Sequence, residues 1–481
     1  MIEPQSQYDP GFSAFGGGTS SSVLHPIVLA GLIVVAVLTF VLPRKYVIVP
    51  LLLGILLTPA GQNLYIGVHL YVYRILILIG WVRLLSSKPS SGRFLPGGFI
   101  TLDKVFLAWA VYRALAVVLL FGQFGAVTNQ AAFLLDSLGG YFLFRSLIRD
   151  DQDVRGVVRV FAAVAMVSAV VMLIELRTGR NILGSLGGIR LISDVRNGRI
   201  RAQGVFAHSI LAGSFGATVL PLFLWLWKRE KARVVATIGA FSASIMVFAC
   251  ASSTPIAAWF GGIGAVCLWP IRKNMRVVRW GIVFALIALQ LVMKAPVWYV
   301  LAHIDLAGGS SGWNRANLID TFIRHVRDWW LIGTHDNVNW GWDMWDQCNQ
   351  FVTEGETGGL VAFGCFITMI VICFKKIGKA RKAVEGKPKK EWLFWLLGAA
   401  MFAQVMAFMG VDYFDQSIFV WYALLAIIPV ATMLPRRVSV AKEPSAASFS
   451  ASESGIAAPD TADVMTFERS NAAMASSRWF V

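Results

Sequence analysis

Charged residues are scarce in this chain. They make up 15% of its 481 residues, and only 27 residues are Asp or Glu. Hydrophobic residues make up 57%, and the mean hydropathy is +0.64. A soluble domain carries about 25% charged residues, so this composition excludes an ordinary water-soluble protein and is typical of a polytopic membrane protein.

Cysteine is also sparse. The five cysteines are scattered, with no CxxC pair and no Cys/His spacing, so neither a disulfide framework nor a metal site is indicated. No basic residue precedes Arg44, so the first apolar stretch lacks the charged start of a signal peptide. We expect no metal and no cofactor.

Long apolar stretches are frequent. Those that are long enough, or nearly so, to cross a bilayer lie at 23–42, 46–58, 64–85, 102–121, 127–147, 154–175, 207–227, 234–251, 255–270, 277–293, 357–374, 392–410 and 417–434. They predict an all-α polytopic membrane protein with about 12–13 transmembrane helices and a membrane domain at 23–434. The stretches at 46–58 and 255–270 are short, so one could be tilted or re-entrant.

Lys and Arg collect on alternate loops. The loop at 375–390 carries eight basic residues against one acid, whereas the loops near 59–63 and 412–416 carry none. Basic loops face the cytoplasm, which predicts an outer N-terminus and an inner C-terminus. The net charge of +16 then reflects topology, and nucleic-acid binding is not expected.

The two ends of the chain differ from the rest in composition. Residues 1–22 are rich in Gly and Ser, and residues 435–481 are rich in Ala, Ser and acids without periodicity. We predict a flexible N-terminal segment and a disordered cytoplasmic tail.

The first of two long extracytoplasmic loops, 176–206, contains six arginines, no lysine and one acid, Asp194. Arginine binds phosphate oxygens through two parallel hydrogen bonds, so this loop is a candidate site for a phosphorylated, lipid-linked substrate. For any single arginine the alternative is contact with lipid head groups. Arg201 is the strongest candidate, because it precedes an apolar span among small residues. Arg190, Arg199 and His208 are further candidates for substrate binding.

The second long loop, 294–356, begins with an expected amphipathic helix. Ser310 and Ser311 can cap it, and apolar residues recur at three- and four-residue steps from Trp313 to Trp330. We expect this helix to lie along the outer interface, with Arg315 in its first turn. Arg324 and Arg327 are expected on its solvated face, in ion pairs with Asp320 and Asp328.

The same loop then alternates tryptophans with acids and amides. Trp340 and Trp342 could stack on sugar rings, while neighbouring carboxylates take the hydroxyl groups. An interfacial aromatic belt is the alternative, although it does not explain the acids.

Three segments carry a resemblance to a known family. The runs at 201–222, 311–322 and 346–360 contain an Arg and a Gly before a span, a Ser-x-x-x-Arg helix, and an Asn followed by a GxxGG run. In order and spacing they resemble the membrane O-antigen ligase and polysaccharide polymerase family.

The resemblance implies a metal-independent glycosyltransferase of the membrane C superfamily. Its partners would be an undecaprenyl-diphosphate-linked oligosaccharide donor, a glycan acceptor and membrane lipids. It would act at the outer face of the bacterial cytoplasmic (inner) membrane in exopolysaccharide, capsule or O-antigen synthesis, alongside other assembly and export proteins. Arg201 and Arg315 would hold the diphosphate and stabilise its growing charge. Asn349 would contact substrate.

One residue departs from the family pattern. Cys348 precedes Asn349, where ligases of this family have a histidine as the expected base, and a thiol is a poor base at neutral pH. His335, Asp346 or Glu354 could serve instead, and His208 lies near Arg201 in sequence. The alternative is that base catalysis is weak and that most of the rate acceleration comes from holding the donor and acceptor close together.

These observations leave three functions open. The first and favoured function is a polymerase. The second is a ligase that moves a finished glycan to a lipid acceptor, and the departure from the family pattern at Cys348 disfavours it. A transporter or flippase of lipid-linked sugars is the third, and it would gather polar groups at the bilayer midplane. Arg74 and Arg113 lie within apolar spans, where they either pair with acids such as Asp136 or Glu175 or line a cavity that reaches the phosphates of the substrate.

Overall fold

The computed structural model describes residues 21–86, 94–228, 232–303, 312–341, 344 and 348–433. Apart from Ser21 and Ser22, the predicted flexible segment 1–22 lies outside the described residues, as does the whole predicted tail 435–481.

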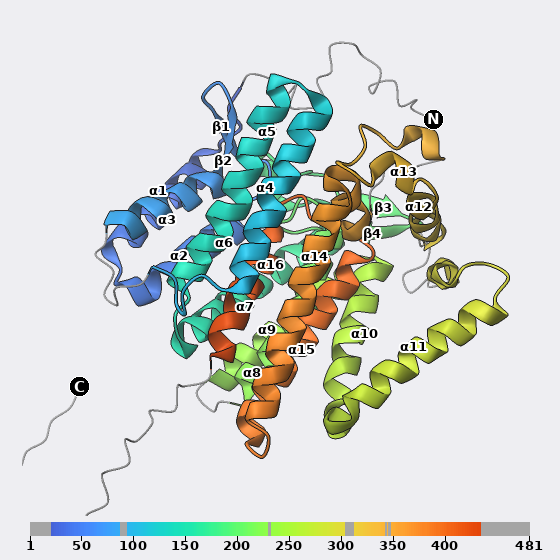
Figure 1. The fold of residues 1–481 in the computed structure, drawn as a ribbon. Helices are drawn as coiled ribbons and strands as arrows, with labels where there is room; N and C mark the ends of the chain where they lie inside the picture. The colour runs from blue at the N-terminus through green and yellow to red at the C-terminus, as the bar shows by residue number, and fades with distance from the viewer. Residues whose placement is uncertain are drawn as a thin grey trace, which may run out of the picture. The chain divides into compact units, whose positions relative to one another are not determined.

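Helices dominate the described chain (Figure 1). The longer ones are α1 (Pro26–Val41), α2 (Arg44–Leu57), α3 (Val72–Ser86), α4 (Thr101–Phe121), α5 (Phe124–Leu134), α6 (Gly140–Leu147), α7 (Asp151–Thr178), α8 (Ser209–Trp227), α9 (Arg233–Ala249), α10 (Ser253–Cys267), α11 (Met275–Val292), α12 (Gly312–Arg324), α14 (Gln350–Ala383), α15 (Pro388–Phe408) and α16 (Ile418–Thr432). Short helical segments are η2 (Leu135–Gly139), η3 (Ile182–Leu186), η5 (Trp269–Asn274), η6 (Val297–His303), α13 (Val326–Trp329) and η7 (Val338–Trp340). Each predicted apolar stretch is helical in whole or in part.

Six of the described helices are long and apolar enough to cross a membrane: α4, α7, α8, α14, α15, and the unit formed by η5 with α11. The helices α1, α9, α10 and α16 are apolar but shorter. The chain is therefore a helical protein whose longest helices have the length and composition of membrane spans.

This architecture agrees with the expectation of an all-α membrane protein, and the described residues also contain two short β-hairpins. Strand β1 (Asn63–Tyr65) pairs with β2 (His69–Tyr71), and β3 (Asp194–Arg196) pairs with β4 (Arg199–Arg201). The apolar stretch at 64–85 therefore begins as a hairpin, and α3 starts at Val72. Gly67 makes the reversal possible, since its φ of 87° is accessible to glycine at little cost.

Two helical regions are irregular where function is expected. The stretch at 127–147 is interrupted by the π-helix η2 between α5 and α6. Helix α14 is kinked at Gly358 and Gly359, whose backbone angles are not helical. Both irregularities change the direction in which the following side chains point.

The core is built around α8 and α16, which are buried along most of their length. Helices α7, α9, α10 and α15 pack against α8, and α4 lies beside α14 (Figure 1). Helix α11 stands apart from them and has no buried residue. Because the outer helix faces are apolar, they are suited to contact with lipid rather than water.

Candidate functional site

The arginine-rich loop folds back on itself at Asn197 and Gly198. Both residues have positive φ, 50° and 73°, as a two-residue hairpin turn requires. The pairing places Asp194 opposite Arg201. An Asn-Gly pair between two short strands is a recognised hairpin signal, so the sequence contained the information from which β3 and β4 could have been predicted.

Arg201 differs from the other arginines of this loop. Its side chain donates from Nη1 to Oδ2 of Asp194 at 2.9 Å, and the residue is only 7% exposed. Its Nε is buried and has no hydrogen-bond partner in the described part of the chain. The other arginines are all exposed: Arg177, Arg180, Arg190, Arg196 and Arg199. The hairpin therefore singles out one guanidinium with donor capacity to spare.

A buried carboxylate fixes the segment that follows Arg201. Glu175, at the end of α7, accepts hydrogen bonds from the Ser193 hydroxyl at 2.9 Å and from the backbone N–H groups of Gln203 and Gly204 at 3.0 Å. Glu175 is thus an anchor of the loop, which corrects the expectation that it could pair with Arg74 or Arg113.

His208 lies at the start of α8, just beyond this anchored segment. Its Nδ1 accepts the backbone N–H of Ile210 at 3.2 Å and caps the helix. Burial and the nearby positive charge of Arg201 lower the pKa of His208 to about 4, so its ring is neutral at pH 7. The single ring proton then sits on Nε2, which makes His208 a hydrogen-bond donor rather than a base.

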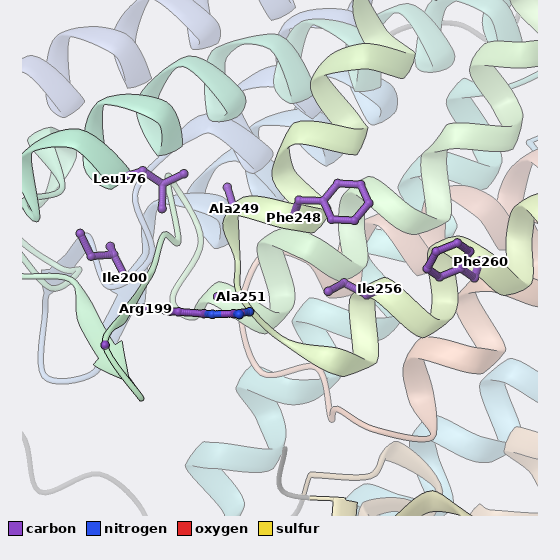
Figure 2. Close-up of a pocket in the computed structure, with 9 residues that line it drawn as sticks. Leu176, Arg199, Ile200, Phe248, Ala249, Ala251, Ile256 and Phe260 are labelled. Carbon is purple, nitrogen blue, oxygen red and sulfur yellow. The ribbon is translucent and has the colours of Figure 1, made fainter. Parts of the chain in front are cut away.

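An open groove runs beside the hairpin (Figure 2). Its volume is about 530 Å³, and Arg199 of β4 extends into it toward Ala251. The remaining wall is apolar and includes Phe248 of α9 and Phe260 of α10, each of which is about half exposed at 52% and 53%. The groove thus joins an apolar surface to a guanidinium group.

The predicted helix of the second loop is confirmed as α12 with α13. Arg315 is buried, at 8% exposure, in the first turn of α12. Arg324 is exposed and pairs with Asp320 at 2.7 Å, as expected for positions one turn apart. Arg327 is exposed on α13. The proposed capping residues, Ser310 and Ser311, lie outside the described residues.

Cys348 is packed in an apolar cluster with Leu318, Phe322 and Trp329. Cys348, the residue that departs from the pattern of the family that the sequence resembles, therefore packs between α12 and the start of α14.

Asn349 caps α14. Its side-chain oxygen accepts the N–H of Phe351 at 2.9 Å, and its amide nitrogen donates to the carbonyl of Met409 at 3.2 Å. Trp340 donates from Nε1 to Asp328 at 3.1 Å and stacks on His325. Both side chains thus have structural contacts of their own. Trp342 and Asp346 lie outside the described residues.

Arg74 and Arg113 each lie beside an acid, as the first of the two alternatives expects, and they also line a cavity. Arg74 forms two hydrogen bonds with Asp136, at 2.8 and 2.7 Å, and Nη1 of Arg113 lies 3.8 Å from Oε1 of Glu354. Glu354 is fully buried and also accepts from Trp109 Nε1 at 2.7 Å. These side chains line a cavity of about 500 Å³, which we name the central chamber.

His335 lines a smaller cavity of about 300 Å³. It shares this cavity with Arg113 and with Glu356, whose Oε1 accepts from the amide of Asn337 at 3.1 Å. Sequence reasoning missed Glu356, although it belongs to the run at 346–360. Among the candidate bases, Glu354 is held by several donors, whereas His335 is exposed.

No model of a known protein family matches this chain, and no curated protein matches it. Among the described residues, no group of three or more His, Cys, Asp or Glu side chains is arranged to hold a metal ion.

Proposed function

We propose that this protein is a membrane glycosyltransferase that polymerises a glycan linked to undecaprenyl diphosphate. It would act on the outer face of a bacterial cytoplasmic membrane and span that membrane 12 or 13 times. The observation that carries the proposal is Arg201, a buried guanidinium with an unpartnered Nε at the edge of a loop rich in exposed arginines.

The surroundings of Arg201 suit a lipid-linked phosphate. The groove beside Arg199 offers apolar walls to a prenyl chain and a cation to the phosphate at its end. Nε2 of His208 adds a neutral donor close to Arg201. We also assign a phosphate contact to Arg315, a buried guanidinium in the first turn of α12. Such donors stabilise the negative charge that develops on a leaving diphosphate.

The proposed reaction is a single displacement. The hydroxyl oxygen of the acceptor glycan bonds to the anomeric carbon of the donor, and the bond from that carbon to the diphosphate oxygen breaks. Undecaprenyl diphosphate leaves with the bonding electrons, and the hydroxyl proton passes to a base. We propose His335 or Asp346 for that base, because Glu354 is committed to Trp109, Gln350 and Arg113.

One observation favours a transporter as the second candidate. The ion pairs of Arg74 with Asp136 and of Arg113 with Glu354 lie among the helices, where transporters hold polar groups. A ligase that uses the same donor remains the enzymatic alternative.

The test is the glycan produced by a deletion strain that carries variants of the gene. We expect Arg201→Ala to reduce polymer about 100-fold or more, the loss typical of removing a donor to a developing anion, and Arg201→Lys to restore little. Arg196→Ala, an exposed arginine of the same hairpin, is the control and should leave polymer nearly normal. Normal polymer from both Arg201 variants would rule out the proposed phosphate contact.

The intermediates that accumulate in the deletion strain separate the three functions. Single repeat units on their carrier outside the membrane indicate a polymerase. Full-length chains retained on undecaprenyl diphosphate indicate a ligase, and repeat units trapped inside indicate a flippase.

A further inference from the structure

We propose that the central chamber is a saccharide subsite that receives the sugar nearest the reacting bond. This inference rests on the proposed function and adds to it a place for the uncharged part of the substrate. The chamber is lined by α3, α4, α5, η2, α14 and α16, and by loop residues including Gly61, Gly188 and Ala207. Its volume of about 500 Å³ lies within the range of small-molecule sites.

The charges of the chamber disfavour phosphate. Its lining contains two guanidinium groups, of Arg74 and Arg113, and three carboxyl groups, of Asp136, Glu354 and Asp415. Both guanidinium groups already lie beside a carboxylate. The arginine loop has the opposite balance, with six arginines and one acid. An anionic ligand group is therefore attracted to the loop, and a neutral one is compatible with the chamber.

Aromatic side chains give the chamber flat apolar surfaces. Tyr71 and Tyr73 lie parallel, with ring planes 2° apart and centroids separated by 5.5 Å. Trp109 and Phe133 add further rings, on the side where Arg113 lies 4.5 Å from the Phe133 ring centroid. Sugar rings present C–H faces, which pack on aromatic surfaces of this kind.

Polar groups in the same wall can take hydroxyl groups. Gln416 is 1% exposed, and its Nε2 donates to the Val205 carbonyl at 2.8 Å, while its Oε1 has no hydrogen-bond partner within the described residues. A sugar hydroxyl can donate to this oxygen. Asn129 lines the chamber as well, with both donor and acceptor capacity. The combination of rings, amides and paired charges suits a polyhydroxylated neutral ligand.

An irregular element places one of the ion pairs. Asp136 lies in the π-helix η2, and this single irregular turn directs it to Arg74 of α3. Such bulges are uncommon and occur frequently at functional sites. The bulge is an independent indication that this part of the chamber has a role beyond packing.

The chamber adjoins the arginine site. Ala207, which lines it, precedes His208 directly and donates its N–H to Asp415 at 2.8 Å. A substrate with its diphosphate at Arg201 and His208 could therefore extend its sugar into the chamber.

The experiment measures the binding of two kinds of ligand to purified full-length protein in lipid nanodiscs. Methyl glycosides of glucose, galactose and mannose are measured by saturation-transfer NMR, and inorganic diphosphate by calorimetry. We expect wild-type protein to bind at least one glycoside, and Tyr71→Leu and Asn129→Leu each to weaken that binding about fivefold to tenfold. Phe284→Ala, on the exposed face of α11, is the control and should change nothing. Tyr71→Phe keeps the ring and should retain binding.

The two sites should respond independently. Arg201→Lys is expected to weaken diphosphate binding and leave glycoside binding unchanged, and the chamber variants to do the reverse. The proposal is overturned if no glycoside binds the wild type, if Tyr71→Leu and Asn129→Leu bind glycoside normally while Tm is unchanged, or if these variants weaken diphosphate instead. Glycoside binding lost in the chamber variants, together with normal polymer in the deletion strain without the gene, would support the chamber and reject the proposed function.

Discussion

His208 is the residue whose chemistry is most changed by its position. In the unfolded chain its pKa is 6.5, and in the folded protein burial and Arg201 lower it to about 4. Between these values the unfolded chain binds a proton and the folded chain does not. This residue therefore makes folding less favourable as pH falls through that window.

We accordingly predict that His208→Asn reduces the acid sensitivity of the protein. Asparagine also caps helices, so the start of α8 should persist while the titrating ring is removed. Thermal unfolding in detergent at pH 5 and pH 7 is the measurement, and the difference in Tm should be smaller in the variant than in the wild type. His25→Asn controls for the exchange, because His25 caps α1 through Nδ1 in the same way. An unchanged difference in Tm would contradict the prediction.

At the scale of elements, the kink in α14 explains the GxxGG run. Gly359 has φ 61° and ψ −163°, and a Cβ at this position would lie 2.3 Å from the carbonyl oxygen of Leu331. The backbone after α13 approaches this point closely, and the N–H of Leu360 donates to the carbonyl of Trp330 at 2.9 Å. The glycine thus permits the contact between this segment and a long helix.

We predict that Gly359→Ala destabilises the protein by at least about 1–3 kcal/mol, because its backbone conformation is essentially confined to glycine. Gly364→Ala, in the same helix, is the matched control. No atom lies within 4 Å of its added Cβ, and alanine favours a helix over glycine by about 0.5–1 kcal/mol. Scanning fluorimetry should show a lower Tm for the first variant and an unchanged or higher Tm for the second. Equal melting of the two would show that the close contact does not matter.

The elements also show what could be predicted from sequence. Apolar length located the helices, since burial or lipid contact requires continuous hydrophobic surface, and the three- and four-residue steps located α12. The same hydrophobicity concealed the β1–β2 hairpin, because its residues resemble the start of a span. The β3–β4 hairpin had a local signal in Asn197 and Gly198. Gln203, a partner of Glu175, and Trp109, a partner of Glu354, are distant from these acids in sequence, so no local pattern could identify them.

At the candidate site, the sequence indicated which residue types could bind the substrate. It did not indicate which of those side chains are buried or what they contact. The prominence of Arg201 was predicted from its place before a span, but its burial and its pairing with Asp194 depend on the hairpin. Arg74 and Asp136 are brought together across α3 and η2. The pairing of residues 62 positions apart is a property of tertiary packing, which is why sequence left two alternatives open.

At the scale of the whole molecule, the orientation of the chain in the membrane decides which loops could meet the proposed substrate. The segment at 375–390 has eight basic residues and one acid, a pattern that predicts a cytoplasmic position for it. The loop at 176–206 also carries six arginines, five of them exposed. An outer position for this loop is therefore an exception to the rule that basic loops face the cytoplasm. The proposed chemistry requires this arginine loop to be outside, because the lipid-linked glycan is used there.

Single introduced cysteines can test this orientation. Ser185 is exposed in the arginine loop and Lys389 is exposed in the first turn of α15, within the basic segment 375–390. We predict that a membrane-impermeant maleimide labels intact cells carrying Ser185→Cys but not Lys389→Cys. Both should be labelled after permeabilisation. Of the five natural cysteines, Cys250, Cys348 and Cys373 are buried, Cys365 is partly exposed and Cys267 is exposed, so a chain with both Cys267→Ser and Cys365→Ser is the background for the two variants. Labelling of Lys389→Cys alone in intact cells would place the arginines inside, where they would follow the usual charge bias, and would remove the argument for an extracytoplasmic phosphate site.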